Sequence, residues 1–294
     1  MKKLKFEGCG TALLTPFAGS EVDYERYARL VDRQVRAGVH FLVPLGTTGE
    51  TPCLTDEERL RILALTREHA AGLPLLVGGG TNSLAGTVRS MRALEPYAPD
   101  AFLIVAPYYN KPTQNGLYEY FKAVAQTTDR GIVIYNVPGR TGVNVTAETT
   151  LRLAEDVDNI IAVKEASGNY SQISEILRNR PEGFSVLSGN DNETLSLMAT
   201  GADGVISVAS NIVPEMMVSL VEAMRAGDLV KARGLHHRLT PLFNACFIES
   251  NPIPAKAAMS LLGLMENSLR LPLVTASIST EEKMRRILSE LGLL

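Results

Sequence analysis

The sequence predicts an α/β protein, a (β/α)8 TIM barrel followed by a C-terminal helical extension. Eight short apolar runs recur at intervals of roughly 20–34 residues, about the length of one strand and its crossover helix. Amphipathic segments of helical period separate the runs. A doubly wound sheet is the structural alternative, but the glycine fingerprint that would favour it after the first strand does not occur. Eight alternating units in a chain of 294 residues therefore favour the barrel.

The expected strands are short apolar runs, most of which end at glycine or proline. Continuous runs without polar alternation are typical of parallel strands that are buried on both faces. Glycine and proline interrupt regular structure and therefore mark the strand ends. In chain order, the expected strands cover residues 10–14, 39–45, 73–77, 101–106, 131–135, 160–164, 184–187 and 204–208.

The expected helices begin and end at residues that suit helix termini. Segment 23–37 carries apolar residues at helical spacing, and Gly38 suits the left-handed position after its end. Thr55 and Glu58 form the sequence signature of a capping box at the start of the next helix. Residues 114–127 also place apolar side chains on one helical face. These patterns predict crossover helices between the strands.

The last part of the chain holds more helix than a barrel needs. Residues 214–226 suit the eighth helix of the barrel, and further helical patterns follow, with Gly263 and Pro272 as interruptions. We therefore expect two domains. The catalytic barrel covers residues 1–226, and a helical extension over residues 227–294 packs on it.

Composition and charge exclude several classes of partner. Charged residues make up 21% and hydrophobic residues 45% of the chain, as in an ordinary globular protein. The net charge of −3 gives no electrostatic reason to expect nucleic acid or an anionic membrane as a partner. No apolar run approaches the ~18 residues of a membrane span, and charges interrupt the N-terminal segment where a signal peptide would be apolar. We expect a cytoplasmic protein.

Cysteine and histidine usage does not indicate a metal site. The three cysteines, Cys9, Cys53 and Cys246, lie far apart and show no ligand spacing. An odd, sparse set of cysteines fits a reducing compartment. Of the four histidines, His236 and His237 fall on an expected helix far from the strand ends. We expect no metal.

Lys164 ends the sixth expected strand, at the end of an otherwise apolar run. An ammonium group is costly to bury, and a desolvated neutral amine is a nucleophile that forms Schiff bases with ketones. The alternative is a lysine that has emerged from the sheet and pairs with Glu165. Because active sites of barrels lie at the carboxyl ends of the strands, the position of Lys164 favours a catalytic role.

Other polar residues also follow the expected strands. Thr47 and Thr48 lie in a glycine-bounded turn that either links strand and helix or holds a small carboxylate with its hydroxyl and N–H groups. Tyr135 either caps the barrel or relays protons for imine chemistry. Arg140 is either a surface charge or an anchor for a carboxylate, and Tyr109 suits a core or subunit contact.

Seven motifs together resemble the dihydrodipicolinate synthase family. They are GTTGE, YYNKPTQNGLY, YNVPGRTG, VKEASGN, LSGND, GVISV and ESNPIPAK, and they run from Gly46 to Lys256. The resemblance covers essentially the whole chain. The related pyruvate aldolases, of the N-acetylneuraminate and 2-keto-3-deoxygluconate types, share the barrel and the lysine.

The resemblance implies an aldolase that uses a Schiff base and needs no cofactor. Its reaction would be the condensation of pyruvate with L-aspartate-4-semialdehyde to 4-hydroxy-tetrahydrodipicolinate, the first committed step of diaminopimelate and lysine biosynthesis. The alternatives are a pyruvate-dependent lyase of a sugar acid and a barrel that binds a keto acid without catalysis. The resemblance also implies a homotetramer built from two tight dimers.

The resemblance assigns a role to each candidate site residue. Lys164 would form the Schiff base, and Tyr135, Thr47 and the neighbouring subunit's Tyr109 would carry protons. Residues that would bind substrate or line the pocket are Thr48, Arg140, Gly189 and Ile206. Members inhibited by lysine carry an acidic residue where Gly86 stands here, and Asp56 and Arg59 occupy the second helix. A cation without a carboxylate suits an ammonium ligand poorly, so we expect weak or absent lysine inhibition.

Overall fold

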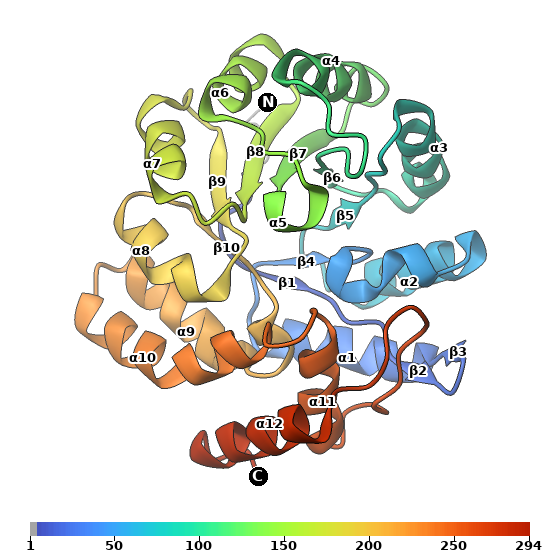
Figure 1. Cartoon of the computed structure of the whole chain (residues 1–294), viewed down its shortest axis with the longest axis vertical. Helices are drawn as coiled ribbons and strands as arrows, with labels where there is room; N and C mark the ends of the chain where they lie inside the picture. Colours follow the sequence, from blue (N-terminus) through green and yellow to red (C-terminus); the bar gives the residue numbers. More distant parts are fainter. Residues whose placement is uncertain (1–4) are drawn as a thin grey trace. The chain divides into compact units, whose positions relative to one another are not determined.

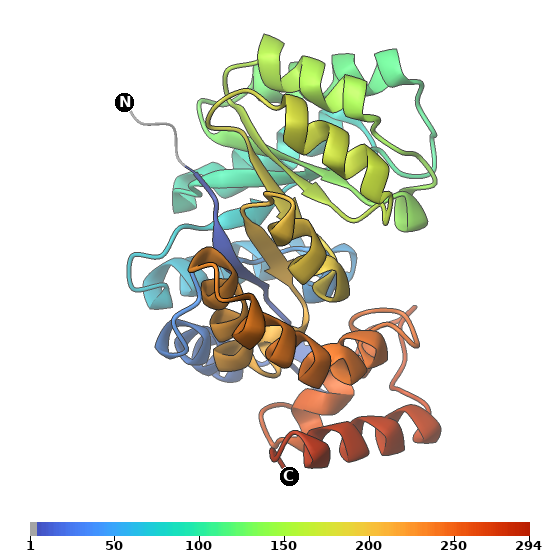
Figure 2. The ribbon, with the colours of Figure 1, turned by 90° about the vertical axis from the view of Figure 1, so that its left-hand side faces the viewer.

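The computed structural model describes residues 5–294, which divide into two compact units. One unit contains Pro74–Ile206 with the described residues up to Glu7, and the other contains Gly8–Leu73 and Ser207–Leu294. The figures colour the chain by sequence, so that the first unit is mainly green and the second is blue and orange to red (Figures 1 and 2). Each unit is described by itself below.

The unit around residues 74–206 carries six strands and the helices between them. The strands are β5 (Leu76–Gly78), β6 (Ala101–Val105), β7 (Gly131–Asn136), β8 (Ile160–Glu165), β9 (Ser185–Ser188) and β10 (Gly204–Ser207). The α-helices are α3 (Leu84–Leu94), α4 (Gln114–Ala125), α5 (Pro138–Thr141), α6 (Ala147–Asp156), α7 (Tyr170–Asn179) and α8 (Thr194–Ala199), with 3-10 turns η3 (Glu95–Tyr97) and η4 (Asp191–Glu193). Helices α3, α4, α6 and α7 lie on the outer side of these strands (Figure 1).

The other unit combines the N-terminal and C-terminal parts of the chain. Its strands are β1 (Gly8–Ala12), β2 (Phe17–Ala18), β3 (Glu21–Val22) and β4 (Phe41–Val43). Its helices are α1 (Tyr24–Arg36), α2 (Asp56–His69), α9 (Pro214–Arg225), α10 (Leu229–Ala245), α11 (Ile253–Leu261) and α12 (Ile278–Glu290), with 3-10 turns η1 (Thr47–Gly49), η2 (Thr51–Cys53) and η5 (Ala209–Asn211). Helix α12, drawn in red, packs against α10 and α11 (Figure 2).

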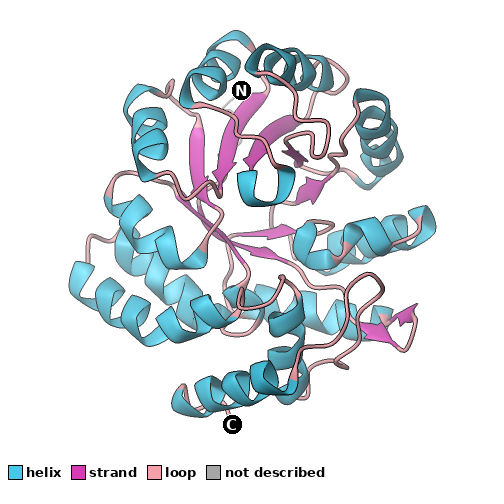
Figure 3. Ribbon diagram, viewed as in Figure 1, coloured by secondary structure: helices cyan, strands magenta, loops and turns pink. Residues whose placement is uncertain are grey.

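The sheet confirms the predicted (β/α)8 barrel. Its eight strands follow the order β4-β1-β10-β9-β8-β7-β6-β5, and the pairs with a recorded register are parallel. Figure 3 shows the strands in magenta and the helices that alternate with them along the chain in cyan. The expected boundary between a barrel and an extension at residue 226 stays a prediction, although helices do follow α9 as expected.

Prolines shorten two strands relative to their prediction. Of the second expected strand, 39–45, only β4 (Phe41–Val43) forms in the structure. The strand ends there because Pro44 has no N–H to donate to a neighbouring strand and Leu45 is left-handed, with φ of 58°. The third, 73–77, begins at Leu76, after Pro74. The Leu73 N–H donates instead to the Ala70 carbonyl at 2.9 Å and closes the preceding turn. The other strands shift by two residues at most.

The short antiparallel hairpin β2–β3 was not predicted. Phe17 pairs with Val22, and Gly19 adopts a φ of 58° in the turn between the two strands. Each strand has only two residues, which is too short to show an alternating pattern. Phe17 is fully buried and therefore anchors the hairpin.

The predicted helix termini are confirmed. Gly38 follows α1 with φ of 79°, and its N–H donates to the Val35 carbonyl at 3.0 Å. Thr55 and Glu58 form the expected capping box: Glu58 N–H donates to Thr55 Oγ1 at 3.2 Å, and Thr55 N–H donates to Glu58 Oε2 at 2.9 Å. Among residues 5–294, no helix combines the length and apolar character needed to cross a bilayer.

Truncating a core side chain tests the packing of the first unit. Phe102 on β6 is fully buried, so Phe102→Ala should lower the free energy of unfolding by about 3–5 kcal/mol. Urea denaturation followed by circular dichroism measures this loss. Phe247→Ala is the control, because the Phe247 side chain is 44% exposed and should cost much less. Equal losses in the two variants would contradict the packing described here.

Candidate active site

Lys164 and Tyr135 lie side by side at the carboxyl ends of two neighbouring strands. They are partners in the β7–β8 register, and side chains of paired residues share a face of the sheet. Lys164 Nζ lies 4.2 Å from the centroid of the Tyr135 ring. Both residues are buried, with 7% and 8% of their surface exposed. Of the predicted site residues, the structure thus brings these two together around one amine.

Glu165 points to the opposite face of β8 from Lys164. Its register partner is Asn136, because residues next to each other on a strand alternate between faces. The Glu165 carboxylate accepts hydrogen bonds from Asn136 Nδ2 at 2.5 Å, Gln172 Nε2 at 3.4 Å and the Ser167 hydroxyl. The alternative in which Lys164 pairs with Glu165 is therefore wrong, since the pleat separates the two side chains.

The network around Glu165 extends into the loop that follows α5. Asn136 Oδ1 accepts from the Val145 N–H at 2.9 Å, and Asn136 Nδ2 also donates to Asn144 Oδ1 at 2.8 Å. Asn144 Nδ2 in turn donates to Gln172 Oε1 at 2.7 Å. No pattern considered above predicts this network. The sequence did contain one sign of it. Asn136 follows Tyr135 and Glu165 follows Lys164, so in neighbouring strands Asn136 and Glu165 point to the same face of the sheet, opposite to Tyr135 and Lys164.

Burial raises the pKa of Glu165 to about 7, and the hydrogen bonds from Ser167 and Asn136 oppose this rise. The side chain is fully buried. A carboxyl group in this position changes its protonation state close to neutral pH. The folded chain therefore favours the protonated form of Glu165, and its stability depends on pH near neutrality.

Gly189 approaches Lys164 from β9. Its N–H donates to the Glu165 carbonyl at 2.6 Å. A Cβ atom at position 189 would lie 2.7 Å from Ala166 Cβ and 3.1 Å from Lys164 Cε, so only glycine fits without displacing its neighbours. Ile206 is fully buried on β10. The structure therefore places Gly189 against the Lys164 side chain, and its role near bound pyruvate stays a prediction.

Arg140 and Tyr109 lie on exposed segments of the same unit. Arg140 is in α5, directly after the end of β7, and its side chain is exposed. Tyr109 is 88% exposed and adopts a φ of 71°. The Tyr109 N–H donates to the Thr141 carbonyl at 3.4 Å, which ties the Tyr109 loop to α5. In the single chain, most of the Tyr109 surface is available to another molecule.

Thr47 and Thr48 form the turn η1 in the other unit. Thr48 is buried, and its Oγ1 accepts a hydrogen bond from Asn251 Nδ2 at 3.0 Å. The carbonyl of Gly49 accepts from Thr15 Oγ1 at 2.8 Å. Asn251 lies in the ESNPIPAK motif but is not among the predicted site residues. The turn is thus held in place by hydrogen bonds from distant segments of the chain.

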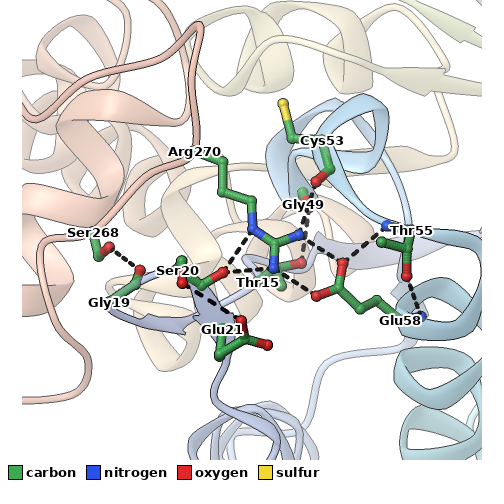
Figure 4. Close-up of polar contacts among 10 residues, drawn as sticks. All are labelled: Thr15, Gly19, Ser20, Glu21, Gly49, Cys53, Thr55, Glu58, Ser268 and Arg270. Atoms are coloured by element: carbon green, nitrogen blue, oxygen red, sulfur yellow. Dashed lines mark hydrogen bonds and ion pairs between the residues drawn. The ribbon is translucent and has the colours of Figure 1, made fainter.

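Arg270 links three segments near this turn (Figure 4). Its guanidinium donates to the Ser20 carbonyl at 2.7 Å, to the Cys53 carbonyl at 2.8 Å and to both Glu58 carboxylate oxygens at 2.5 and 2.6 Å. The hydrogen bond from Arg270 is the main cause that lowers the pKa of Glu58. Arg270 thereby joins the β2–β3 hairpin, η2 and the start of α2.

Comparison with known proteins identifies the family of the chain. The model of the Dihydrodipicolinate synthetase family matches residues 5–291. The chain belongs to this family. The 4-hydroxy-tetrahydrodipicolinate synthase of Thermotoga neapolitana is 48% identical over 293 residues, which cover 98% of this chain and all of the relative. The enzyme of the same name from Parabacteroides distasonis is 48% identical over 295 residues, with 100% and 99% covered.

Solved structures of family members share the fold. Dihydrodipicolinate synthase from Thermotoga maritima superposes with a TM-score of 0.97 at 47% identity, covering 99% of this chain and 100% of that chain. The enzyme from Cyanidioschyzon merolae, solved with lysine bound, gives a TM-score of 0.95 at 38% identity and covers 98% and 99%. These likenesses confirm the predicted family and the (β/α)8 fold.

Replacing Glu165 by glutamine should flatten the pH dependence of stability. The folded chain holds the Glu165 proton more tightly than the unfolded chain, so this group's stabilising contribution is lost as the pH rises through about 7. Between pH 5 and pH 8, the wild type should lose on the order of 2 kcal/mol of unfolding free energy through Glu165. Glu165→Gln should lack this loss because it mimics the protonated acid.

Urea denaturation of both proteins at pH 5 and pH 8 measures the difference. Glu175→Gln is the matched control, because Glu175 is an exposed carboxylate on α7 in the same unit. The control should retain the wild-type dependence on pH. An unchanged dependence in Glu165→Gln would contradict the assigned titration.

Proposed function

We propose that this chain catalyses the condensation of pyruvate with L-aspartate-4-semialdehyde to 4-hydroxy-tetrahydrodipicolinate through a Schiff base on Lys164. The observation that carries this proposal is the buried Lys164 amine, 4.2 Å from the Tyr135 ring at the ends of β8 and β7. Membership of the family and the shared name of the most similar relatives support the choice of substrates.

The first half of the reaction forms a nucleophile from pyruvate. The neutral Lys164 amine attacks the ketone carbon, and the resulting carbinolamine loses water to give an imine. In this proposal Tyr135, whose ring lies beside the amine, passes protons to and from this centre as water leaves. The protonated imine then accepts electrons when the pyruvate methyl group loses a proton, and an enamine forms. The imine itself is the electron sink of this step.

The second half joins the two substrates and releases the enzyme. The enamine carbon attacks the aldehyde carbon of the semialdehyde, and the aldehyde oxygen takes up a proton and becomes a hydroxyl group. The amino group of the second substrate then attacks the imine carbon. This closes the ring and displaces the Lys164 amine, so that the enzyme returns to its starting state.

The remaining site residues bind and orient the two substrates in this proposal. Thr48 binds the pyruvate carboxylate, and Thr47 takes part in the proton relay. Arg140 binds the carboxylate of the semialdehyde, for which an exposed guanidinium after β7 is suited. Gly189 and Ile206 line the space for pyruvate, and the absence of a Cβ at position 189 supports that role.

Tyr109 completes the proton relay of a neighbouring subunit in this proposal. The 88% exposure of its side chain in the single chain supports a partner at this loop. We propose a homotetramer made of two tight dimers, in the cytoplasm. Among the solved relatives is a monomeric variant of dihydrodipicolinate synthase, with a TM-score of 0.97 at 47% identity, covering 98% of each chain.

Lysine inhibition should be weak or absent in this chain. Arg59 lies at the start of α2 and pairs with Asp56 at 3.3 Å, and Gly86 in α3 offers no carboxylate. Arg59 already neutralises the Asp56 carboxylate, and position 86 adds no second carboxylate for an ammonium group to bind. Sub-millimolar inhibition of turnover by L-lysine would contradict this part of the proposal.

Reductive trapping tests the assigned nucleophile. With pyruvate present, borohydride should add one reduced pyruvate to Lys164, which peptide mass spectrometry detects. Lys164→Met should give no adduct, whereas Lys283→Met, which alters an exposed lysine on α12, should give the wild-type adduct. An adduct on another lysine would reject the mechanism.

Turnover with aspartate semialdehyde, N-acetylmannosamine and glyceraldehyde separates the synthase from a sugar-acid lyase, and binding without any turnover would indicate a keto-acid sensor.

Mixing two inactive variants tests the shared site. Lys164→Met should abolish turnover, and Tyr109→Phe should reduce it strongly by interrupting the relay. If Tyr109 acts in the neighbouring subunit, mixed oligomers contain one intact site, and a one-to-one mixture should regain about one quarter of wild-type activity. Sedimentation of the same samples gives the oligomeric state. An active monomer, or a mixture without recovery, would contradict the shared site.

A further inference from the structure

Lys256 and Glu50 form an ion pair that is removed from solvent. Both side chains are fully buried, and Lys256 Nζ pairs with Glu50 Oε1. Lys256 Nζ also donates to the Ser268 carbonyl at 2.9 Å and lies 4.0 Å from the centroid of the Phe17 ring. Burial is the main cause that lowers the pKa of Lys256 to about 8, and the Glu50 carboxylate opposes this fall. The reaction described above uses neither residue.

A buried ion pair of this kind calls for an explanation other than stability. Desolvating two charges costs about as much as their attraction returns, and apolar replacements of similar volume are often as stable. A pair that is retained in the interior can instead fix one particular arrangement of the chain. The position of Glu50 shows which arrangement this pair holds.

Glu50 ends the turn that carries the two threonines. Its backbone is left-handed, with φ of 53° and ψ of 35°, which is unfavourable for a residue other than glycine. The Glu50 N–H donates to the Thr47 carbonyl at 3.1 Å, and the Glu50 carbonyl accepts from the Cys53 N–H at 2.8 Å. The residue therefore joins η1 to η2, so that contacts to its side chain act on the end of η1.

The C-terminal segment holds this turn from two further directions. Asn251 Nδ2 donates to Thr48 Oγ1 at 3.0 Å, and the Arg270 N–H donates to Glu50 Oε2 at 3.2 Å. The Arg270 side chain binds the Ser20 and Cys53 carbonyls and Glu58, so that the backbone N–H is itself held in place (Figure 4). Lys256 is the member of this set whose side-chain charge pairs with Glu50.

We propose that Lys256 is a positioning residue for pyruvate binding, because its ion pair with Glu50 fixes the Thr47–Gly49 turn in the orientation that receives the pyruvate carboxylate. The proposal rests on the function proposed above, which assigns the carboxylate to Thr48. Lys256 touches neither substrate. It sets the affinity for pyruvate and leaves the chemistry at Lys164 unchanged once pyruvate is bound.

The test measures the affinity for pyruvate separately from chemistry and from stability. Borohydride trapping at increasing pyruvate gives the half-saturating concentration and the plateau of adduct on Lys164, and thermal denaturation gives Tm. Lys256→Met should raise the half-saturating concentration about tenfold and leave the plateau within about twofold of the wild type. It should also lower Tm, because Glu50 stays buried without its partner.

A double variant separates positioning from neutralisation of a buried charge. Lys256→Met with Glu50→Gln removes both charges, so Tm should recover toward the wild type. The half-saturating concentration should stay raised, because the turn has lost its ion pair. If the double variant binds pyruvate as the wild type does, Lys256 merely neutralises Glu50 and the proposal is overturned. The double variant also carries the test if Lys256→Met does not fold.

Arg180→Met is the matched control for a general loss of stability. Arg180 lies in the unit that contains residues 74–206. It pairs with Asp203 and donates to the Phe184 carbonyl, before β9, and to the Gly201 carbonyl, before β10. It should lower Tm without changing the half-saturating concentration. An equal rise in the control would overturn the proposal. If the wild type forms no adduct, the proposed function fails together with this proposal. If the wild type forms the adduct and the double variant has the wild-type half-saturating concentration of pyruvate, only the positioning role is rejected.

Discussion

The position of Lys164 at the buried carboxyl end of β8 is the condition on which the proposed chemistry depends. In this proposal the lysine amine must reach the ketone carbon of pyruvate directly. The strand β8 brings Lys164 to its carboxyl end with 7% of its surface exposed, and the parallel register with β7 places the Tyr135 ring beside it. The requirement for Gly189 follows from the same crowding, because any Cβ there would press on the lysine side chain.

The pleat of β8 gives two adjacent polar residues different tasks. Lys164 lies on the face that carries Tyr135, and Glu165 lies on the face that carries Asn136. Because Glu165 has no contact with water, its carboxylate needs hydrogen-bond donors, and Asn136, Ser167 and Gln172 supply them. The resulting network joins the ends of β7 and β8 to the loop after α5 and so holds the strand end that carries Lys164.

The unit formed by the N-terminal and C-terminal parts of the chain also holds polar residues in place through buried contacts. It must hold a short turn whose last residue, Glu50, adopts an unfavourable left-handed conformation. Regular secondary structure does not stabilise such a turn, so side chains from the C-terminal segment do so, among them Asn251, Lys256 and Arg270. Two of these residues lie at or near α11, so the helices after the eighth strand contribute directly to holding this turn.

The sequence by itself determined the order of strands and helices and the family, and it singled out Lys164 as the candidate nucleophile. Local signals carry these features: apolar runs for β6 to β8, the Thr55–Glu58 capping box for α2, and an isolated lysine at a strand end. Only the tertiary structure decided the partners of buried polar groups. Glu165 with Gln172, Thr48 with Asn251 and Glu50 with Lys256 are separated by 7 to more than 200 residues, and the pairing of such groups depends on which faces the fold brings together. No periodicity or spacing within the chain encodes these pairings. A buried polar group needs a hydrogen-bond partner, and only the fold decides which groups are buried next to each other.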